Sequence, residues 1–247
     1  MIQASRLVAA LSLLCTLCAC AELRSAPWSQ IGKGTHTVGA STGWAFYEAE
    51  VSLDDQSGEP VLGSGVATTD LDPIAGGALK YNYFVTDHFV VGLIFEFRTF
   101  DPDPVAPLDS EIDADEYTSV HYLFSTRYWS DPFGDDLRFK WFGGLDLNFT
   151  PGVDLDATVI YAPGFVERVA LSGDEFFTLN PVLGVSYLLQ DNLSIEGGAF
   201  YEFPLNSSDD DLVLNIPNGL GATAANNVAG SLEPEGLIFF AGLTYYL

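Results

Sequence analysis

The residues best placed for chemistry in this 247-residue sequence surround one histidine, His121. It is the only one of the three histidines in the middle of an alternating run, with Ser119, Ser125 and Arg127 at even spacing from it. Side chains at even spacing share one face of a strand, and Glu96 could approach from the adjacent strand. These residues can be drawn as a Ser-His-Glu site, with serine as nucleophile and histidine as general base. We favour the other interpretation, a histidine satisfied by hydrogen bonds in a polar interior, because the strand register points His121 inward.

Other sequence features that could bind a cofactor or a metal are weak. The sequence has no Walker loop, dinucleotide fingerprint or HExxH motif. Carboxylates gather between residues 101 and 116 and at residues 209–211, but without the spacing of a calcium-binding loop. We therefore expect solvated acidic loops and no cofactor, with weak bridging of divalent cations to anionic surface lipids as the remaining metal role.

The first 21 residues have the character of an export signal. They carry one cation, Arg6, followed by an apolar run from Leu7 to Ala21. That run is shorter than the roughly 18 to 20 residues of a membrane-spanning helix, so it predicts a cleaved signal peptide at residues 1–21. All three cysteines of the chain (Cys15, Cys18 and Cys20) lie within it. Cleavage after Ala21 leaves a mature chain without thiols or disulfides, whereas the alternative, lipidation, would retain Cys20.

The elements that must position the polar residues are strands. Eight runs rich in Tyr, Phe, Val and Leu alternate with a period of two residues, and they are longer than the strands of most globular proteins. Their length suits tilted strands that cross a membrane. The predicted strands span residues 37–51, 73–85, 89–100, 116–129, 137–150, 175–188, 193–203 and 235–247.

The connections between these strands alternate in length. Residues 86–88, 130–136 and 190–192 are short and rich in turn residues, whereas residues 52–72, 101–115, 151–174 and 204–234 form long, acidic connections. Short turns at one end and long loops at the other are typical of outer-membrane barrels. The sequence therefore predicts an all-β, eight-stranded antiparallel transmembrane barrel over residues 37–247, preceded by a periplasmic segment over residues 22–36.

Charged residues within the strands are predicted to face the barrel interior. Alternation in the run 137–150 places Leu145 and Leu147 outward and Lys140 and Asp146 inward. A narrow eight-stranded barrel is filled by its side chains, so buried ions there must pair. We expect a plugged lumen that contains an interior charge network of Lys80, Glu96, Arg98, Arg127, Arg138, Lys140, Asp146, Glu196 and Glu202.

The overall composition excludes other classes of protein. Nine Lys and Arg against 34 Asp and Glu give a net charge of −25, which argues against a nucleic-acid partner. The chain is nevertheless 48% hydrophobic and 13% aromatic, so disorder is not expected.

Two hairpins and the C-terminus resemble a known family. Residues 79–96 (LKYNYFVTDHFVVGLIFE) and 185–200 (VSYLLQDNLSIEGGAF) are similar to hairpins of small OmpA-type and OmpW-type outer-membrane β-barrel proteins. The last strand is similar to their C-terminal assembly signal, through Gly242, Tyr245 and the final Leu247. The resemblance implies a place in a Gram-negative outer membrane, contact with its lipids, and delivery by periplasmic chaperones to the barrel assembly machinery.

The resemblance leaves the function open, because members of such families act as structural tethers, adhesins, solute channels and lipid-modifying enzymes. We expect a non-enzymatic barrel with a structural or surface-interaction role. One alternative is a narrow channel for small or apolar solutes. Another is an acyl hydrolase similar to the lipid A deacylases, although His121-Tyr122-Leu123 lacks the serine of their His-x-Ser motif.

Overall fold

The computed structural model describes residues 28, 31–55, 64–71, 75–101, 103–108, 110–134, 137–152, 154–161, 165–172, 175–206, 208–217 and 223–247. The predicted leader, with Cys20, lies outside the described residues. Among those residues, no helix combines the length and hydrophobicity needed to cross a bilayer. The strands are β1 (His36–Asp55), β2 (Ser64–Leu71), β3 (Ala75–Phe84), β4 (Phe89–Phe100), β5 (Val105–Leu108), β6 (Ser110–Ala114), β7 (Tyr117–Trp129), β8 (Phe139–Thr150), β9 (Asp154–Tyr161), β10 (Phe165–Ser172), β11 (Phe176–Gln190), β12 (Leu193–Pro204), β13 (Ser208–Pro217) and β14 (Thr223–Tyr246).

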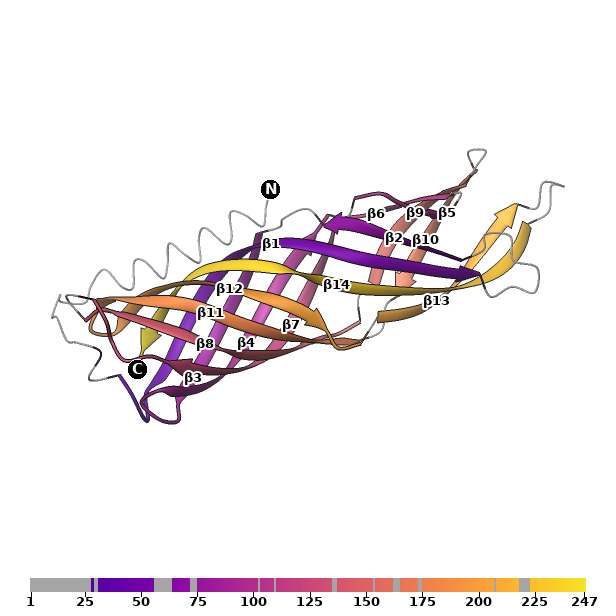
Figure 1. Cartoon of the computed structure of the whole chain (residues 1–247). Helices are drawn as coiled ribbons and strands as arrows, with labels where there is room; N and C mark the ends of the chain where they lie inside the picture. Colours follow the sequence, from indigo (N-terminus) through magenta and orange to yellow (C-terminus); the bar gives the residue numbers. More distant parts are fainter. Residues whose placement is uncertain are drawn as a thin grey trace.

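Eight of these strands close into a barrel, which confirms the predicted fold (Figure 1). Strands β1, β3, β4, β7, β8, β11, β12 and β14 follow one another around the wall in chain order, each antiparallel to the next. The ring closes because β14 pairs with β1, from Thr37 opposite Tyr246 to Asp55 opposite Val228. Closure satisfies the backbone hydrogen bonds of every wall strand, which a membrane-spanning sheet requires.

The pairing register shows how strongly the wall is staggered. One circuit of directly opposed residues starts at Phe139 on β8 and returns to that strand at Phe149, a displacement of ten residues. The circuit runs through Phe139, Tyr187, Ile195, Leu243, Ala40, Leu79, Phe95, Tyr122 and Phe149. A stagger of this size requires tilted strands, typically at about 35–45° to the barrel axis, and leaves a lumen that side chains can fill.

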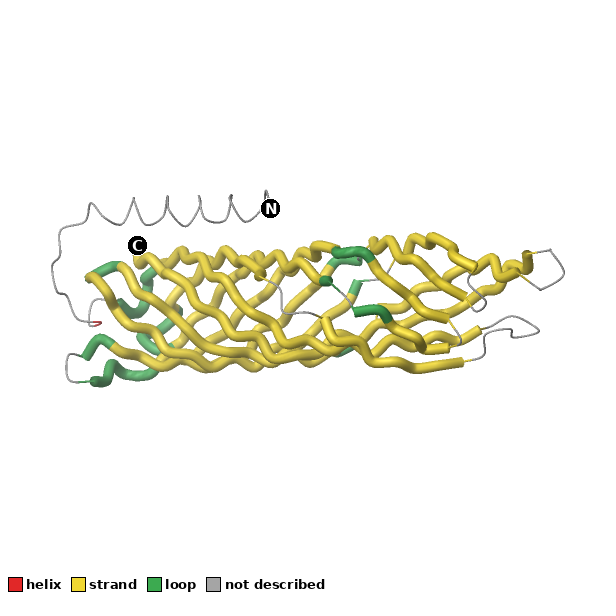
Figure 2. The backbone as a smooth tube through the Cα atoms, turned by 90° about the horizontal axis from the view of Figure 1, so that it is seen from above, coloured by secondary structure: helices red, strands yellow, loops and turns green. Residues whose placement is uncertain are grey.

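The long connections differ from the predicted loops because each of them contains strands. Strands β2 and β13 pair with the outer parts of β1 and β14, and a second sheet has the order β10-β9-β6-β5. Strand β2 lies beside β5, and β10 lies beside β13, so the β-structure continues beyond the barrel (Figure 2). Strands β1 and β14 are correspondingly longer than predicted. These segments are short, and acidic or small residues interrupt their apolar alternation, so the sequence pattern did not reveal them.

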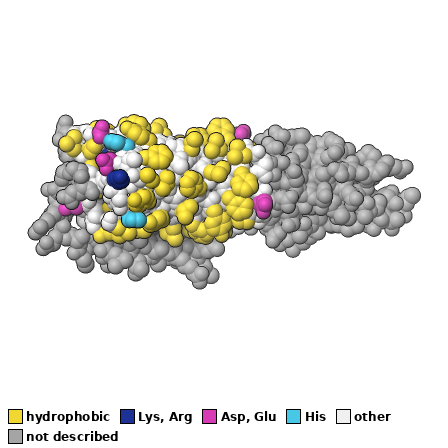
Figure 3. All heavy atoms as spheres, turned by 90° about the horizontal axis from the view of Figure 1, so that it is seen from below, with side chains coloured by type: hydrophobic (Ala, Val, Ile, Leu, Met, Phe, Trp, Pro, Cys, Tyr) yellow, Lys and Arg dark blue, Asp and Glu magenta, His cyan; other side chains and the backbone are white. Residues whose placement is uncertain are grey.

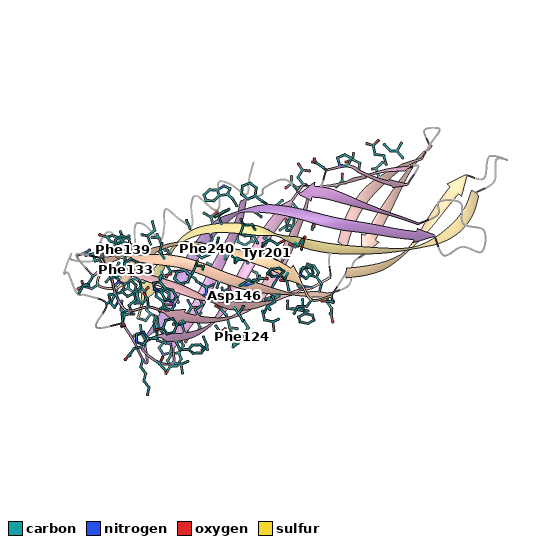
Figure 4. All side chains as sticks on the ribbon, viewed as in Figure 1. Phe124, Phe133, Phe139, Asp146, Tyr201 and Phe240 are labelled. Atoms are coloured by element: carbon teal, nitrogen blue, oxygen red, sulfur yellow. The ribbon has the colours of Figure 1, made fainter. Side chains whose placement is uncertain are left out.

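The two faces of the barrel wall differ in polarity. On β8, Trp141, Leu145 and Leu147 are exposed on the outer surface, whereas Lys140 and Asp146 are buried. Figure 3 shows hydrophobic side chains covering the wall, with charged and histidine side chains toward its ends. In Figure 4, Asp146 lies among the wall strands and Phe124 lies at their outer side, in agreement with the burial of the first and the exposure of the second.

Residues before β1 also belong to the short-turn end of the barrel. Trp28 and Ile31 are buried there, and the chain enters β1 after a turn in which the backbone N–H of Gly34 donates to the carbonyl oxygen of Phe84. In the turn between β7 and β8, Leu137 has a φ of 54°, a conformation that non-glycine residues rarely adopt. The segment before β1 is therefore packed against the short-turn end of the barrel.

The outward face provides a direct test of the register. We expect Leu145→Arg to lower the free energy of unfolding in lipid vesicles by about 2–4 kcal/mol, because the charge would lie near the bilayer midplane. The control is Phe139→Arg on the same strand and the same face, at the short-turn end, where the cost should be roughly 0–1 kcal/mol. Urea titration of both variants measures the difference, and equal costs would contradict the assigned membrane depth.

Candidate functional site

The candidate site is the barrel lumen, which is closed at the short-turn end by apolar side chains. We name this group the basal cluster, and its members are Trp28, Phe84, Trp129, Leu188 and Tyr246, all of which are buried. The ring centroid of Trp28 lies 5.9 Å from that of Trp129 and 5.5 Å from that of Tyr246. The Trp129 and Phe84 rings are 5.8 Å apart. The rings thus form one continuous packed group across the mouth of the barrel.

Trp28 is fixed in this cluster by polar contacts as well as by packing. Its indole Nε1 donates a hydrogen bond of 2.7 Å to the carbonyl oxygen of Arg138, which also accepts from the backbone N–H of Leu188. The ammonium group of Lys140 lies 5.1 Å from the Trp28 ring centroid, a cation–π geometry. Sequence reasoning missed this role of Trp28. The signal available was the pair Trp28 and Ile31, two large apolar residues in a polar stretch.

Above the basal cluster lies a set of four charges, which we name the lower polar cluster. Lys80 on β3 pairs with Glu196 on β12, and Arg127 on β7 pairs with Asp146 on β8 at 2.9 Å. Strands β3 and β12 are separated in the wall by β1 and β14, so the Lys80–Glu196 pair crosses the lumen. All four side chains are buried.

Three further aromatic rings, those of Phe142, Phe200 and Phe240, lie inside the barrel beside the charged groups. The Phe240 ring lies 6.3 Å from both Phe142 and Phe200. A Cβ on Gly184 would collide with the Phe142 ring, so glycine leaves the space that this ring occupies. The guanidinium of Arg127 lies 5.3 Å from the Phe142 centroid, and that of Arg98 lies 5.8 Å from the Phe200 centroid. The Phe142 ring also stacks on Trp129 at 5.0 Å, so these rings continue the basal cluster into the lumen beside the charged groups.

The upper polar network is centred on Arg98 and Glu202. Arg98 Nη1 donates to Glu202 Oε2 at 2.6 Å, while its Nε and Nη2 both donate to the Glu96 carboxylate at 3.0 Å. The other oxygen of Glu202, Oε1, accepts hydrogen bonds from Asn148 Nδ2 at 2.9 Å and from the Thr178 hydroxyl at 2.8 Å. Because β4 and β12 lie on opposite sides of the ring, this network also connects opposite walls.

His121 lies in the upper network. Its Nε2 is 2.6 Å from Ser119 Oγ, and its Nδ1 is 2.8 Å from Thr150 Oγ1 and 3.2 Å from Asn148 Nδ2. Glu96 is directly opposite His121 in the sheet register, but the hydrogen bonds described for its carboxylate come from Arg98. Of the three residues of the possible Ser-His-Glu site, Ser119 and His121 are therefore in contact within a buried polar network. The Glu96 carboxylate instead accepts hydrogen bonds from the guanidinium of Arg98.

The structure places the nine residues of the predicted charge network as follows. Seven are buried, namely Lys80, Arg98, Arg127, Lys140, Asp146, Glu196 and Glu202, and Glu96 is partly buried. Arg138 differs, because it precedes β8 in the turn and is only partly buried. Its Nη1 donates to the carbonyl oxygens of Leu188 and Leu189, both at 3.2 Å. The strand starts later than predicted, so Arg138 stabilises the end of the barrel.

The C-terminal residues close the ring at the same end. Gly242 packs so closely against Ala40 and Ser41 of β1 that a Cβ would collide with their backbone. Tyr245 and Leu247 are exposed on the outside, and the backbone N–H of Leu247 donates to the carbonyl oxygen of His36. Within the described part of the chain, no group of three or more His, Cys, Asp or Glu side chains could hold a metal ion.

Comparison with known proteins identifies the fold. No protein-family model matches the sequence, and no curated protein sequence matches it either. The crystal structure of the outer membrane protein OprG from Pseudomonas aeruginosa is similar, with a TM-score of 0.54 and 14% identity over 87% of this chain and 97% of that chain. The solid-state NMR structure of the outer membrane protein AlkL aligns with a TM-score of 0.47 and 14% identity, over 92% and 95% of the two chains. The chain has the fold of a small bacterial outer-membrane β-barrel.

The pair across the lumen can be tested by removing one or both partners. Lys80→Met should lower the free energy of unfolding by about 3–5 kcal/mol, because it leaves the Glu196 carboxylate buried without its partner. The double variant Lys80→Met/Glu196→Leu should recover most of that loss, since an apolar pair carries no desolvated charge. Urea unfolding in detergent measures both, with Lys33→Met at the exposed short-turn end as the control. A double variant no more stable than the single one would show that the two side chains are not coupled.

Proposed function

We propose that this barrel is a non-conducting protein of a Gram-negative outer membrane, with a structural or surface-interaction role. The observation that carries the proposal is the filled lumen, in which two ion-paired groups connect opposite walls. A solute passing through would have to separate Lys80 from Glu196 and Arg98 from Glu202 in a region of low dielectric constant. It would also have to displace the basal cluster, which includes Trp28.

The interaction surface in this proposal is the β-structure beyond the barrel. Strands β5 and β6 and the residues beside them carry exposed carboxylates, at Asp101, Asp103, Glu111, Asp113 and Asp115. A surface of this charge favours cationic partners, or anionic lipids bridged by divalent cations. The lipids of the outer membrane are the proposed permanent partners of the wall, and the barrel assembly machinery is the proposed route of insertion.

A narrow channel for small or apolar solutes is the second candidate function. The observation that favours it is the set of buried polar atoms that have no hydrogen-bond partner in the described part of the chain. Most of these atoms face the lumen, and buried polar groups of this kind are normally satisfied by water. Water inside the barrel would lower the barrier to a small solute, although the rings of Phe142, Phe200 and Phe240 still lie in the interior.

Conductance separates the two candidates. In planar bilayers we expect the unaltered protein to show no discrete conductance steps, because paired charges and aromatic rings fill the lumen. The combined variant Trp28→Ala/Phe142→Ala/Phe240→Ala, which removes three rings from the interior without breaking an ion pair, should show conductance steps. Stable steps from the unaltered protein would contradict the primary proposal and favour the channel.

We also propose that the barrel is not a hydrolase, because Ser119 and His121 are buried and the Glu96 carboxylate is engaged by Arg98. Mass spectrometry of lipid A from cells with and without the protein should give the same acyl pattern, and Ser119→Ala should change nothing. Loss of an acyl chain that depends on both Ser119 and His121 would establish the enzyme instead.

A further inference from the structure

The outward face of the wall continues past the strand ends on one side of the barrel. Phe133, in the turn between β7 and β8, forms an antiparallel bridge with Phe139, the first residue of β8. The backbone N–H of each residue donates to the carbonyl oxygen of the other, at 2.9 and 3.3 Å. Residues that are directly opposite in such a bridge share one face. Phe133, which is 44% exposed, therefore lies on the same outward face as Phe139.

Phe133 extends a row of outward-facing aromatic side chains. Its ring stacks on that of Phe139 at 5.8 Å, and the rings of Phe139 and Tyr187 are 4.7 Å apart. Figure 4 shows Phe133 and Phe139 next to each other at this end of the barrel. Two residues further along β8, on the same face, the Trp141 ring lies 5.7 Å from that of Tyr128 on β7. The apolar outer surface thus runs from the wall into the turn without a break.

The neighbouring turn, between β11 and β12, adds a second apolar residue at this end. Leu188 is buried inside the barrel, whereas the next residue, Leu189, is 38% exposed. The guanidinium of Arg138 joins the two turns, because its Nη1 donates to the carbonyl oxygens of Leu188 and Leu189, both at 3.2 Å. Phe133 and Leu189 are therefore presented by two turns that are held together.

Leu137 adds a third apolar side chain, at a conformational cost. Its φ of 54° lies in the left-handed region, which glycine, asparagine or aspartate adopts more readily than leucine. Leu137 is 51% exposed, so packing within the protein does not account for a leucine at this position. An apolar environment outside the protein would account for it. We name Phe133, Leu137 and Leu189 the apolar turn patch.

The opposite side of the barrel is polar at the same end. Strands β1 and β8 face each other across the ring, since three strands separate them in either direction. Lys33 precedes β1 and is exposed, and its backbone N–H donates to Asp87 Oδ1, in the turn between β3 and β4. Like Phe133, Lys33 lies just beyond the strand ends. The two sides therefore present different chemistry at the same end of the molecule.

We propose that the apolar turn patch is immersed in the phospholipid leaflet next to the short-turn end, at the boundary between headgroups and acyl chains. The barrel then sits deeper in the bilayer on the side of β8 and β11 than on the side of β1. Phenylalanine and leucine side chains favour this boundary, whereas Lys33 and Asp87 favour water. Lipid is the partner because the patch is continuous with the wall that lipid covers. This inference rests on the bilayer placement in the proposed function, and not on whether the lumen conducts.

The test is the accessibility of spin labels in lipid vesicles. Four variants each carry one cysteine: Phe133→Cys and Leu189→Cys in the patch, Leu145→Cys in the middle of the wall, and Lys33→Cys as the matched control at the opposite side. Serine replaces the leader cysteines in all of them (Cys15, Cys18 and Cys20). Each variant is labelled with a methanethiosulfonate nitroxide in vesicles of phosphatidylethanolamine and phosphatidylglycerol. Power saturation then gives the collision rates with oxygen, which concentrates in lipid, and with a water-soluble nickel complex. Heat-modifiable gel migration verifies that each variant is folded.

We expect the oxygen-to-nickel collision ratio at positions 133 and 189 to exceed that at position 33 at least about threefold, because the patch lies at the headgroup boundary and Lys33 in water. The ratio at position 145 should be higher still. The Leu189→Cys variant leaves the stacked rings unchanged, so it decides the test if Phe133→Cys does not fold.

Two other outcomes contradict different statements. If positions 133 and 189 give the same ratio as position 33 while position 145 reports lipid, the immersion of the turns is wrong and the proposed function stands. The patch would then be a surface for a protein partner. If position 145 is as accessible to nickel as position 33, the placement of the wall in a bilayer is wrong, and both proposals fail.

Discussion

The hydrogen-bonded pairing of β1 with β14 governs the other features of this barrel. A sheet in a bilayer has no water to satisfy its edges, so the first and last strands must find each other. That closure fixes eight strands with a stagger of ten residues and thereby fixes the width of the lumen. A lumen of this width must be filled by the side chains that alternation directs inward.

The interior of the barrel is unusual for a protein core because many of its side chains are charged. The wall has to be apolar outside, and every second residue therefore points into a space that lipid does not reach. Ions are tolerated there because they meet across the lumen: Lys80 and Glu196 are 116 residues apart in the chain, and Arg98 and Glu202 are 104 apart. A continuous group of aromatic rings packs beside these pairs, and the pairs connect the walls of the barrel.

The end of the barrel that carries the long connections is built differently from the wall. There the strands leave the bilayer, the apolar outer face is no longer needed, and β1 and β14 continue as a ribbon flanked by β2 and β13. The second sheet, from β10 to β5, stands beside it. Backbone pairing gives this region order, and in the proposed function its acidic side chains determine what it binds.

The strands of the wall, their inward and outward faces and the barrel class could all be predicted from the sequence, because a period of two residues is a local property that lipid makes visible. Alternation also indicates which ions within the strands face inward, but not which of them meet. Which ions pair depends on the stagger of the strands around the whole ring. The Lys80–Glu196 pair and the Arg98–Glu202 pair across the lumen therefore form only when the ring is closed, whereas Glu96 lies on the same strand as Arg98. The folded barrel was needed to place Arg138 outside the network. Strand β8 starts at Phe139, two residues later than predicted, so Arg138 lies in the turn and not in the lumen. The folded barrel was needed likewise to bring Trp28 into the mouth of the barrel, because no periodicity in a short polar segment encodes a contact with strands that follow about a hundred residues later.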